Sequence, residues 1–441
     1  MNQQRKNLKA YIIPAMISNV AFFLLSVIDG MFVGNGVSDD ALGAINLAIP
    51  FVMVVGAIAV LFSIGGVAIT AIRLGQEDVE GSNQSFMHAV TLTMVVFTLL
   101  TVVGTVFSEQ VAMLLGARGV YVEMVSDYVF WYSVFLIPVA MFTCLSTFCR
   151  NDGEPKLSTV AVVSYTLLNI FGDWLLVIVL DYGIAGAAFA TGASQIAACL
   201  ILSTHFIRKR GKLRIGRYRS EGKLYGEILL RGLPDLVSQV AAPITTYSIN
   251  RVLNGMGSGL EGGNPFINAY AVISYVGALF TALMYGLSTG LQPLYGKSYG
   301  AADGKSLRYY FRSGLIMSVT GGLGLFGLAM IVGKPFCLVL NADAAATEVV
   351  MSALPKYCLS YVFAASCAVI ASYLLSTKRT GQATAINACR SMVFNFLCIN
   401  FLPLLFGAEF VWYTMAVAEA VCLLIAALLC CGSERKGIVY R

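Results

Sequence analysis

The stretch "GAINLAIPFVMVVGAIAVLFSIGGVAITAIR", Gly43 to Arg73, has no charged residue before its last position. An α-helix that crosses a bilayer needs about 20 predominantly apolar residues, because it rises only about 1.5 Å per residue. This stretch is longer, which predicts a tilted helix or one that continues past the lipid. It therefore assigns the chain to the integral membrane proteins.

Similar apolar runs recur along the whole chain. Of its 441 residues, 58% are hydrophobic and 12% are charged, and the mean hydropathy is +0.78, whereas a soluble domain has roughly 25% charged residues. We predict an all-α integral membrane protein with twelve transmembrane helices in two six-helix bundles. The predicted spans are residues 10–34, 43–73, 85–107, 121–149, 157–180, 184–207, 227–254, 266–296, 308–332, 350–376, 383–405 and 409–431.

The two bundles are predicted to be copies of one six-span unit. An offset of 225 residues separates Gly65 from Gly290, each near the end of a second span, and an offset of 220 separates Pro14 from Pro234, which open the first spans. An even number of crossings returns each copy to its starting side, so a pseudo-two-fold axis along the membrane normal should relate them. The predicted domains are an N-terminal bundle at 1–207, a cytoplasmic basic linker at 208–226 and a C-terminal bundle at 227–441.

The basic residues gather on one side of the predicted membrane. The chain has 29 Lys and Arg against 23 Asp and Glu, a net charge of +6, and cytoplasmic segments normally carry the excess of Lys and Arg. We assign the basic residues, Arg390 included, to inner segments, except for Arg118, Arg251, Lys334 and Lys356. This places both termini in the cytoplasm and explains the positive charge without a nucleic-acid partner.

A few ionisable residues interrupt the apolar spans. An Asp at the centre of a transmembrane helix costs about 2.5 to 3.5 kcal/mol on insertion scales, so such residues are functional candidates by default. Asp29 lies in span one, Asp173 in span five with Asn169 one turn below it, and Thr191 in span six. All are predicted at one depth in the outer half of the N-terminal bundle, where they could meet.

No Lys or Arg of this bundle is predicted at that depth. A proton, a sodium ion or a cationic substrate would then neutralise Asp29 and Asp173. The alternative is that Asp29 is a solvated residue at a helix end and Asp173 only bonds neighbouring helices.

Further polar residues, predicted to line the substrate cavity or to be secondary polar groups, lie in the second copy and the sixth span. Glu419 lies near the predicted midplane of span twelve, its positional counterpart in the first copy is Gln195, and Asn250 roughly replaces Asp29. For Glu419 a hydrogen bond between helices and a role in transport are equally expected. Pro14 removes a backbone donor inside span one and could bend it. The eleven cysteines have no spacing typical of zinc or redox sites, so we expect packing roles and no metal centre.

Several pieces of the chain resemble the multidrug and toxic compound extrusion (MATE) family of transporters. They are Pro14 with "IDGMFVG", then "ALGAINLAIPF", "NIFGDW", "GIAGAAFATGASQ" and "VWYTMAVAEA", and together they cover essentially the whole chain. The resemblance implies a prokaryotic member in the inner (plasma) membrane of a bacterium. It also implies that Pro14 marks the bending region of span one, and that a polar network binds a coupling proton or sodium ion through Asp29, Asn169, Asp173 and Thr191.

The chain departs from the family pattern at two places. Leu25 stands where some members carry a tyrosine, and span ten has no Asp or Glu, whereas some relatives bind cations there. The second departure favours the N-terminal bundle as the ion site.

Two functions are compatible with these features. The favoured one is a cation-coupled (H⁺ or Na⁺) antiporter that exports amphipathic, cationic organic compounds by alternating access. The alternative is a flippase for a lipid-linked saccharide or another amphiphile, which should line its cavity with Lys or Arg. No nucleophile constellation suggests an enzyme, and "GAADGKS", Gly300 to Ser306, lacks the spacing of a phosphate loop. We expect a monomer in contact with membrane lipids, with no cofactor besides the coupling ion.

Overall fold

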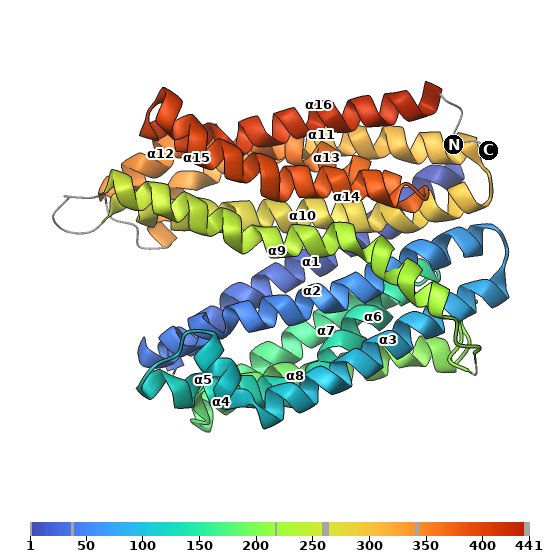
Figure 1. The fold of residues 1–441 in the computed structure, drawn as a ribbon, viewed down its shortest axis with the longest axis horizontal. Helices are drawn as coiled ribbons and strands as arrows, with labels where there is room; N and C mark the ends of the chain where they lie inside the picture. Colours follow the sequence, from blue (N-terminus) through green and yellow to red (C-terminus); the bar gives the residue numbers. More distant parts are fainter. Residues whose placement is uncertain (1, 37–38, 217, 258–263, 340–343, 436–441) are drawn as a thin grey trace. The chain divides into compact units, whose positions relative to one another are not determined.

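The structure, a computed structural model, describes residues 2–36, 39–216, 218–257, 264–339 and 344–435. Within these ranges the regular elements are all helical, and no strand is present. Figure 1 shows the long helices of each half running roughly alongside one another. The elements are α1 (Asn2–Gly36), α2 (Asp39–Gly75), α3 (Val79–Val106), α4 (Ser108–Leu114), α5 (Val120–Val134), α6 (Leu136–Asn151), α7 (Pro155–Asp173), η1 (Trp174–Val179), α8 (Gly183–Ile207), α9 (Gly222–Met256), α10 (Pro265–Gly300), α11 (Gly304–Val339), α12 (Ala344–Cys358), α13 (Ser360–Ser376), α14 (Thr380–Ala388), η2 (Cys389–Phe394), α15 (Asn395–Phe406), η3 (Ala408–Tyr413) and α16 (Thr414–Arg435).

Length and apolar composition identify the membrane spans. Among the described residues, 10 helical segments are long and apolar enough to cross a bilayer, and the pair α5 and α6, bent by 50°, raises the number to 11. The remaining long helix is α9, with 35 residues. Its first turns carry Lys223, Glu227 and Arg231, which lower its mean hydropathy. Together with α9, the 11 segments make up the twelve membrane helices that the apolar runs predict.

The described contacts divide the chain into two compact units. The first unit is Lys9–Leu236, and the second is Met1–Leu8 together with Val237–Arg441. The division falls inside α1 and inside α9. A central helix organises each unit: α6 contacts α2, α3, α7 and α8, and α13 contacts α10, α11, α14 and α16. The linker boundaries predicted at 208 and 226 are untested and stay a prediction.

Local backbone geometry repeats in the two halves. The turn between α2 and α3 has a left-handed residue, Glu77 (φ 61°), followed by Asp78, and the turn between α10 and α11 has Ala302 (φ 53°) followed by Asp303. Asp78 accepts a hydrogen bond from the Gly81 N–H at 2.8 Å, and Asp303 accepts one from the Ser306 N–H at 3.0 Å. Both acids therefore cap the next helix, 225 residues apart, at the offset that the glycines predict.

Irregularities of the helices repeat as well. The fourth helix of each half breaks, at Phe135 and at Leu359. The fifth helix of each half contains a π-helical segment, η1 and η2. Such segments are rare and occur frequently at functional sites. They direct attention to the polar residues next to them.

Candidate functional site

Asp173 is the last residue of α7 and directly precedes the π-helical segment η1. Its side chain is buried, and Asn169, one turn earlier, is buried too. The Asn169 Nδ2 donates a hydrogen bond to the Asp173 Oδ2 at 2.6 Å. The pair therefore shares one helix face, as the spacing of four residues predicts. A carboxylate is held here, inside a membrane span, by a neutral amide donor.

Helix α8 touches α7 at this level. A Cβ atom on Gly172 would lie only 2.8 Å from the Ala190 Cβ, so the two helices are in close contact there. Asp173 follows Gly172, and Thr191 follows Ala190, which places both polar residues at the same level of the contact. Thr191 is partly exposed. One turn along α8 lies Gln195, which is 6% exposed.

The Gln195 Oε1 is one of the buried polar atoms of the described chain that has no hydrogen-bond partner. An unsatisfied buried acceptor is costly and needs an explanation such as an ion or a water molecule. α8 therefore carries a buried hydrogen-bond acceptor without a partner, the Gln195 Oε1, one turn from Thr191.

The predicted residues of span one can be placed only in part. Asp29 lies in α1, but its side chain is outside the described residues, so its meeting with Asp173 stays a prediction. The Pro14 carbonyl accepts hydrogen bonds from the Thr159 Oγ1 at 2.8 Å and from the Ser18 Oγ at 2.9 Å. Thr159 belongs to α7, so this bond ties α1 to the helix that carries Asp173. Helix α1 continues through Pro14, and the hinge at this residue stays a prediction.

Glu419 forms an ion pair that the sequence did not predict. The Arg390 Nε donates to the Glu419 Oε1 at 2.7 Å, and the side chains are 25% and 5% exposed. Arg390 lies in η2, ten residues after the start of the span Thr380–Phe406, which is roughly 15 Å along the helix. Its assignment to an inner segment is therefore wrong. A buried carboxylate on α16 stabilises a cation at this depth, and the acid in span twelve was the available signal.

Two further acidic or polar residues lie on α9. Asn250 is partly exposed on its second half, and its correspondence to Asp29 stays a prediction. Asp235 follows Pro234 and is also partly exposed. Asp235 is not among the predicted site residues, although an acid directly after a proline within a predicted span is visible in the sequence.

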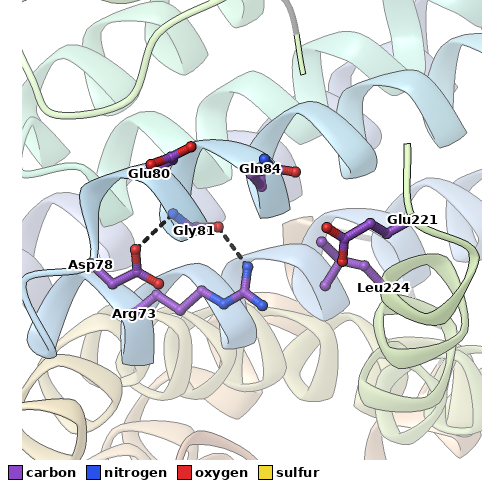
Figure 2. Close-up of a pocket in the computed structure, with 7 residues that line it drawn as sticks. All are labelled: Arg73, Asp78, Glu80, Gly81, Gln84, Glu221 and Leu224. Carbon is purple, nitrogen blue, oxygen red and sulfur yellow. Dashed lines mark hydrogen bonds between the residues drawn. The ribbon is translucent and has the colours of Figure 1, made fainter. Parts of the chain in front are cut away.

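A polar pocket of about 260 Å³ lies elsewhere in the first unit, where α2 ends and α3 begins (Figure 2). The Arg73 Nη1 donates to the Gly81 carbonyl at 2.7 Å and to the Ser85 Oγ at 2.9 Å, so its charge closes the turn that Asp78 caps. The pocket contains none of the predicted site residues, and two of its charged side chains, Arg73 and Asp78, hold the turn between α2 and α3. The lining residues are Arg73, Asp78, Glu80, Gly81, Gln84, Glu221 and Leu224.

Comparison with known proteins identifies the family. The MatE family profile matches residues 14–175 and again residues 240–400. The chain belongs to the MatE family. The two separate matches agree with a duplicated six-span unit, one copy in each half.

Relatives of MatE type cover nearly the full length. Multidrug export protein MepA of Staphylococcus saprophyticus is 24% identical over 433 residues, which is 96% of this chain and 93% of that protein. Multidrug export protein MepA of Staphylococcus aureus is 22% identical over 431 residues, with the same shares. A solved structure, described as the outward-facing conformation of a multidrug resistance MATE family transporter of the MOP superfamily, has a TM-score of 0.89 and 20% identity. It covers 99% of this chain and 96% of that chain.

Membership of the MatE family has two direct consequences. The chain is a multi-span membrane transporter and not an enzyme. The all-α fold with twelve membrane helices, predicted from the apolar runs, is confirmed by the helices of the structure and by the fold of its neighbours.

Proposed function

We propose that this transporter is a cation-coupled antiporter that exports amphipathic organic cations by alternating access, driven by H⁺ or Na⁺. The observation that carries the proposal is the buried Asn169–Asp173 pair at the joint between α7 and η1. Acidic groups inside membrane spans are costly, and they typically mark ion or proton pathways. A proton or a sodium ion that exchanges with an organic cation at this carboxylate would link the two fluxes.

The surroundings of Asp173 support a conformational response. A π-helical segment begins at the next residue, so the helix changes its backbone hydrogen bonding at the carboxylate. The bond from Thr159 to the Pro14 carbonyl links α7 to α1, and Gly172 lies in close contact with α8. A change of charge at Asp173 would then alter the packing of α1, α7 and α8. One charge that crosses 100 mV releases about 2.3 kcal/mol, which suffices to bias such an equilibrium.

The ion site extends in this proposal to Asp29 and Thr191, with Na⁺ or H⁺ bound mainly by Asp29 and Asp173. The substrate class rests on the relatives, which are named multidrug export proteins. We place the protein in the plasma membrane of a bacterium with both termini in the cytoplasm, as a monomer. Gln195 and Asn250 are secondary polar residues of this scheme, and Glu419 acts in it only through its ion pair with Arg390.

One observation bears on the alternative, a flippase for a lipid-linked saccharide. Such a protein needs cationic groups for a pyrophosphate, and Arg390 is a cation within a span. Its guanidinium is already bonded to Glu419, so binding of a pyrophosphate would require this ion pair to break. The antiporter is therefore the better supported function.

The test uses proteoliposomes and ethidium, a fluorescent amphipathic organic cation. A proton gradient alone and a sodium gradient alone are imposed in separate arms, and the gradient that drives ethidium transport identifies the coupling ion. Asp173→Asn should lower the ion-driven component roughly 5- to 150-fold while the protein stays folded. Asp127→Asn, the same change at an exposed acid of α5 in the same unit, should leave transport unchanged. Full ion-driven transport by Asp173→Asn would refute the assignment.

A further inference from the structure

The segment between α8 and α9 is bound along the first unit by its own backbone. We call residues 208–223 the basic strap. The N–H groups of Lys212 and Leu213 donate to the Asp152 carboxylate at 2.9 and 3.1 Å. Further on, the Arg214 N–H donates to the Asn83 Oδ1 at 2.7 Å. These backbone bonds give the strap a defined path over the ends of α3 and α6.

Buried groups secure the same path. Asp152 has a side chain that is 1% exposed and also bonds the His205 Nε2 at 2.8 Å. The side chain of Leu213 is fully buried. Near the other end of the strap, the Glu221 N–H donates to the His88 Nε2 at 2.9 Å, and the Tyr218 hydroxyl donates to the Thr91 Oγ1 at 2.7 Å. The backbone therefore faces the protein along much of the strap.

The charged side chains of the strap point the other way, into solvent. The basic residues that are exposed are Arg208, Lys209, Arg210, Lys212, Arg214, Arg219 and Lys223. None of these seven forms an ion pair with a described residue. The strap bonds to Asp152, which is buried and already accepts from backbone N–H groups and His205, and it contains one exposed acid, Glu221. With seven exposed cations against this one acid among its described residues, the strap presents a surface of net positive charge.

The strap begins where a candidate membrane span ends. The span Ala185–Ile207, identified by its length and apolar composition, is directly followed by Arg208, and we place the first cations of the strap beside the edge of the hydrocarbon layer on this basis. Two isoleucines flank this end and are exposed, Ile207 by 70% and Ile215 by 53%. Apolar side chains next to cations suit the boundary between lipid headgroups and acyl chains.

From these observations we infer that the basic strap is a binding surface for anionic phospholipid headgroups at the membrane face where α8 ends. Clusters of about four to eight Lys and Arg directly beside a transmembrane helix attract anionic lipids. Arg side chains can bind a phosphate with two parallel hydrogen bonds, which favours a phosphodiester over other anions. The pinned backbone holds these groups ready, so less side-chain and loop freedom is lost when a lipid binds. This lipid surface is independent of the coupling ion and of the exported compound.

The test measures lipid selectivity of the full chain in nanodiscs of phosphatidylcholine with phosphatidylglycerol. Spin-labelled phosphatidylglycerol and spin-labelled phosphatidylcholine report the fraction of lipid immobilised by the protein. The natural sequence should prefer phosphatidylglycerol by about five-fold, the effect of one Lys or Arg beside an anionic surface. Salt at about 0.5 M should weaken the preference, because exposed charges are screened.

Matched variants separate the strap from charge in general. The triple variant Arg208→Gln, Lys209→Gln, Arg210→Gln should lower the preference, because it removes three of the seven exposed cations of the strap. The triple variant Arg118→Gln, Arg251→Gln, Lys334→Gln removes the same charge from exposed residues on the predicted outer side and should keep it. Asn83→Ala removes one anchor without changing the charge and should lower the preference partly.

Two results would overturn the inference. One is an unchanged preference in the strap triple variant at equal thermal stability. The other is loss of the preference on addition of soluble glycerol phosphate, which would assign the strap to a free phosphate compound instead of a lipid. An unchanged preference in the presence of glycerol phosphate, together with its decrease in the strap variant, supports a lipid surface.

Discussion

Asp173 in the first unit and Glu419 in the second are both carboxylates buried within membrane helices, and their partners differ. Asp173 accepts a bond from the neutral amide of Asn169 on its own helix at 2.6 Å. Glu419 accepts a bond from the Arg390 guanidinium of another helix at 2.7 Å. The second carboxylate thus has a resident cation that joins α16 to η2. The comparison teaches that the two copies of a duplicated unit can use a buried acid in different ways, as a proposed exchange site in one copy and in an ion pair in the other.

The largest expected effect comes from breaking the ion pair of the second unit. Arg390→Ala should destabilise the protein by about 3 to 5 kcal/mol, because it leaves Glu419 as a buried charge without its partner. The measurement is the free energy of unfolding in detergent, followed by thermal or denaturant melting. The double variant Arg390→Met, Glu419→Gln removes both charges and should recover most of the loss. Equal stability of the single and double variants would contradict a structural ion pair.

The second prediction compares transport by Asp173→Asn with transport by the double variant Arg390→Met, Glu419→Gln. Asp173→Asn should lower ion-driven ethidium transport by roughly 5- to 150-fold, the range of a coupling free energy of about 1 to 3 kcal/mol. Arg390→Met, Glu419→Gln should retain ion-driven transport, since its charges already neutralise each other. The measurement is the rate of ion-driven ethidium transport in proteoliposomes with equal protein content. Transport that fails in the double variant but persists in Asp173→Asn would reverse the roles of the two acids.

Much of the fold was predictable because each span is a long apolar run. The offset between Gly65 and Gly290 also predicted the repeat, which the caps at Asp78 and Asp303 and the two π-helical segments now display in the backbone. The pairing of Asn169 with Asp173 followed from a spacing of four residues on one helix. Such local relations depend on helix geometry alone, so the sequence contains them.

The ion pair of the second unit was not predictable in the same way. Arg390 and Glu419 lie on different helices, 29 residues apart, and their contact depends on how η2 packs against α16. The positive-inside rule assigns Lys and Arg to cytoplasmic segments, and it led to the prediction that Arg390 lies in an inner segment. The predicted span 383–405 nevertheless contains this residue. The rule describes loops and loses validity where a buried acid stabilises the cation.

The third prediction tests whether the start of α9 is part of the first unit. There is no room for a Cβ atom on Gly65, because the backbone of Ile228 and Gly232 faces it directly. Gly65→Ala should therefore push α2 from α9 and cost about 1 to 3 kcal/mol, the usual range for overpacking. Gly56→Ala, on the same helix with nothing within 4 Å of its added Cβ, should be neutral or slightly stabilising, since Ala favours helix over Gly. Melting temperatures that fall equally in both variants would argue against the close contact.

The smallest expected effect concerns the two helix caps, Asp78 and Asp303, which lie 225 residues apart in the two copies. Asp303 accepts hydrogen bonds from the Ser306 hydroxyl and the Ser306 N–H, and these bonds hold the pKa of its carboxyl below the usual value. Asp303→Ala should cost about 1 kcal/mol, the typical value of an N-cap, and Asp78→Ala should cost a similar amount because it caps α3 in the same way.

The pH dependence of Asp303 has a definite sign. A carboxyl whose pKa is lower in the folded state stabilises the protein above its unfolded pKa of about 3.9 and loses this contribution as the pH falls through the folded value. The stability difference between the natural protein and Asp303→Asn, which keeps a capping side chain but cannot ionise, should therefore be constant from pH 8 to about pH 5. Below about pH 4 the natural protein should lose stability relative to Asp303→Asn. Melting curves at stepped pH measure this stability difference, and a difference that changes between pH 8 and 5 instead would show that another group titrates with the cap.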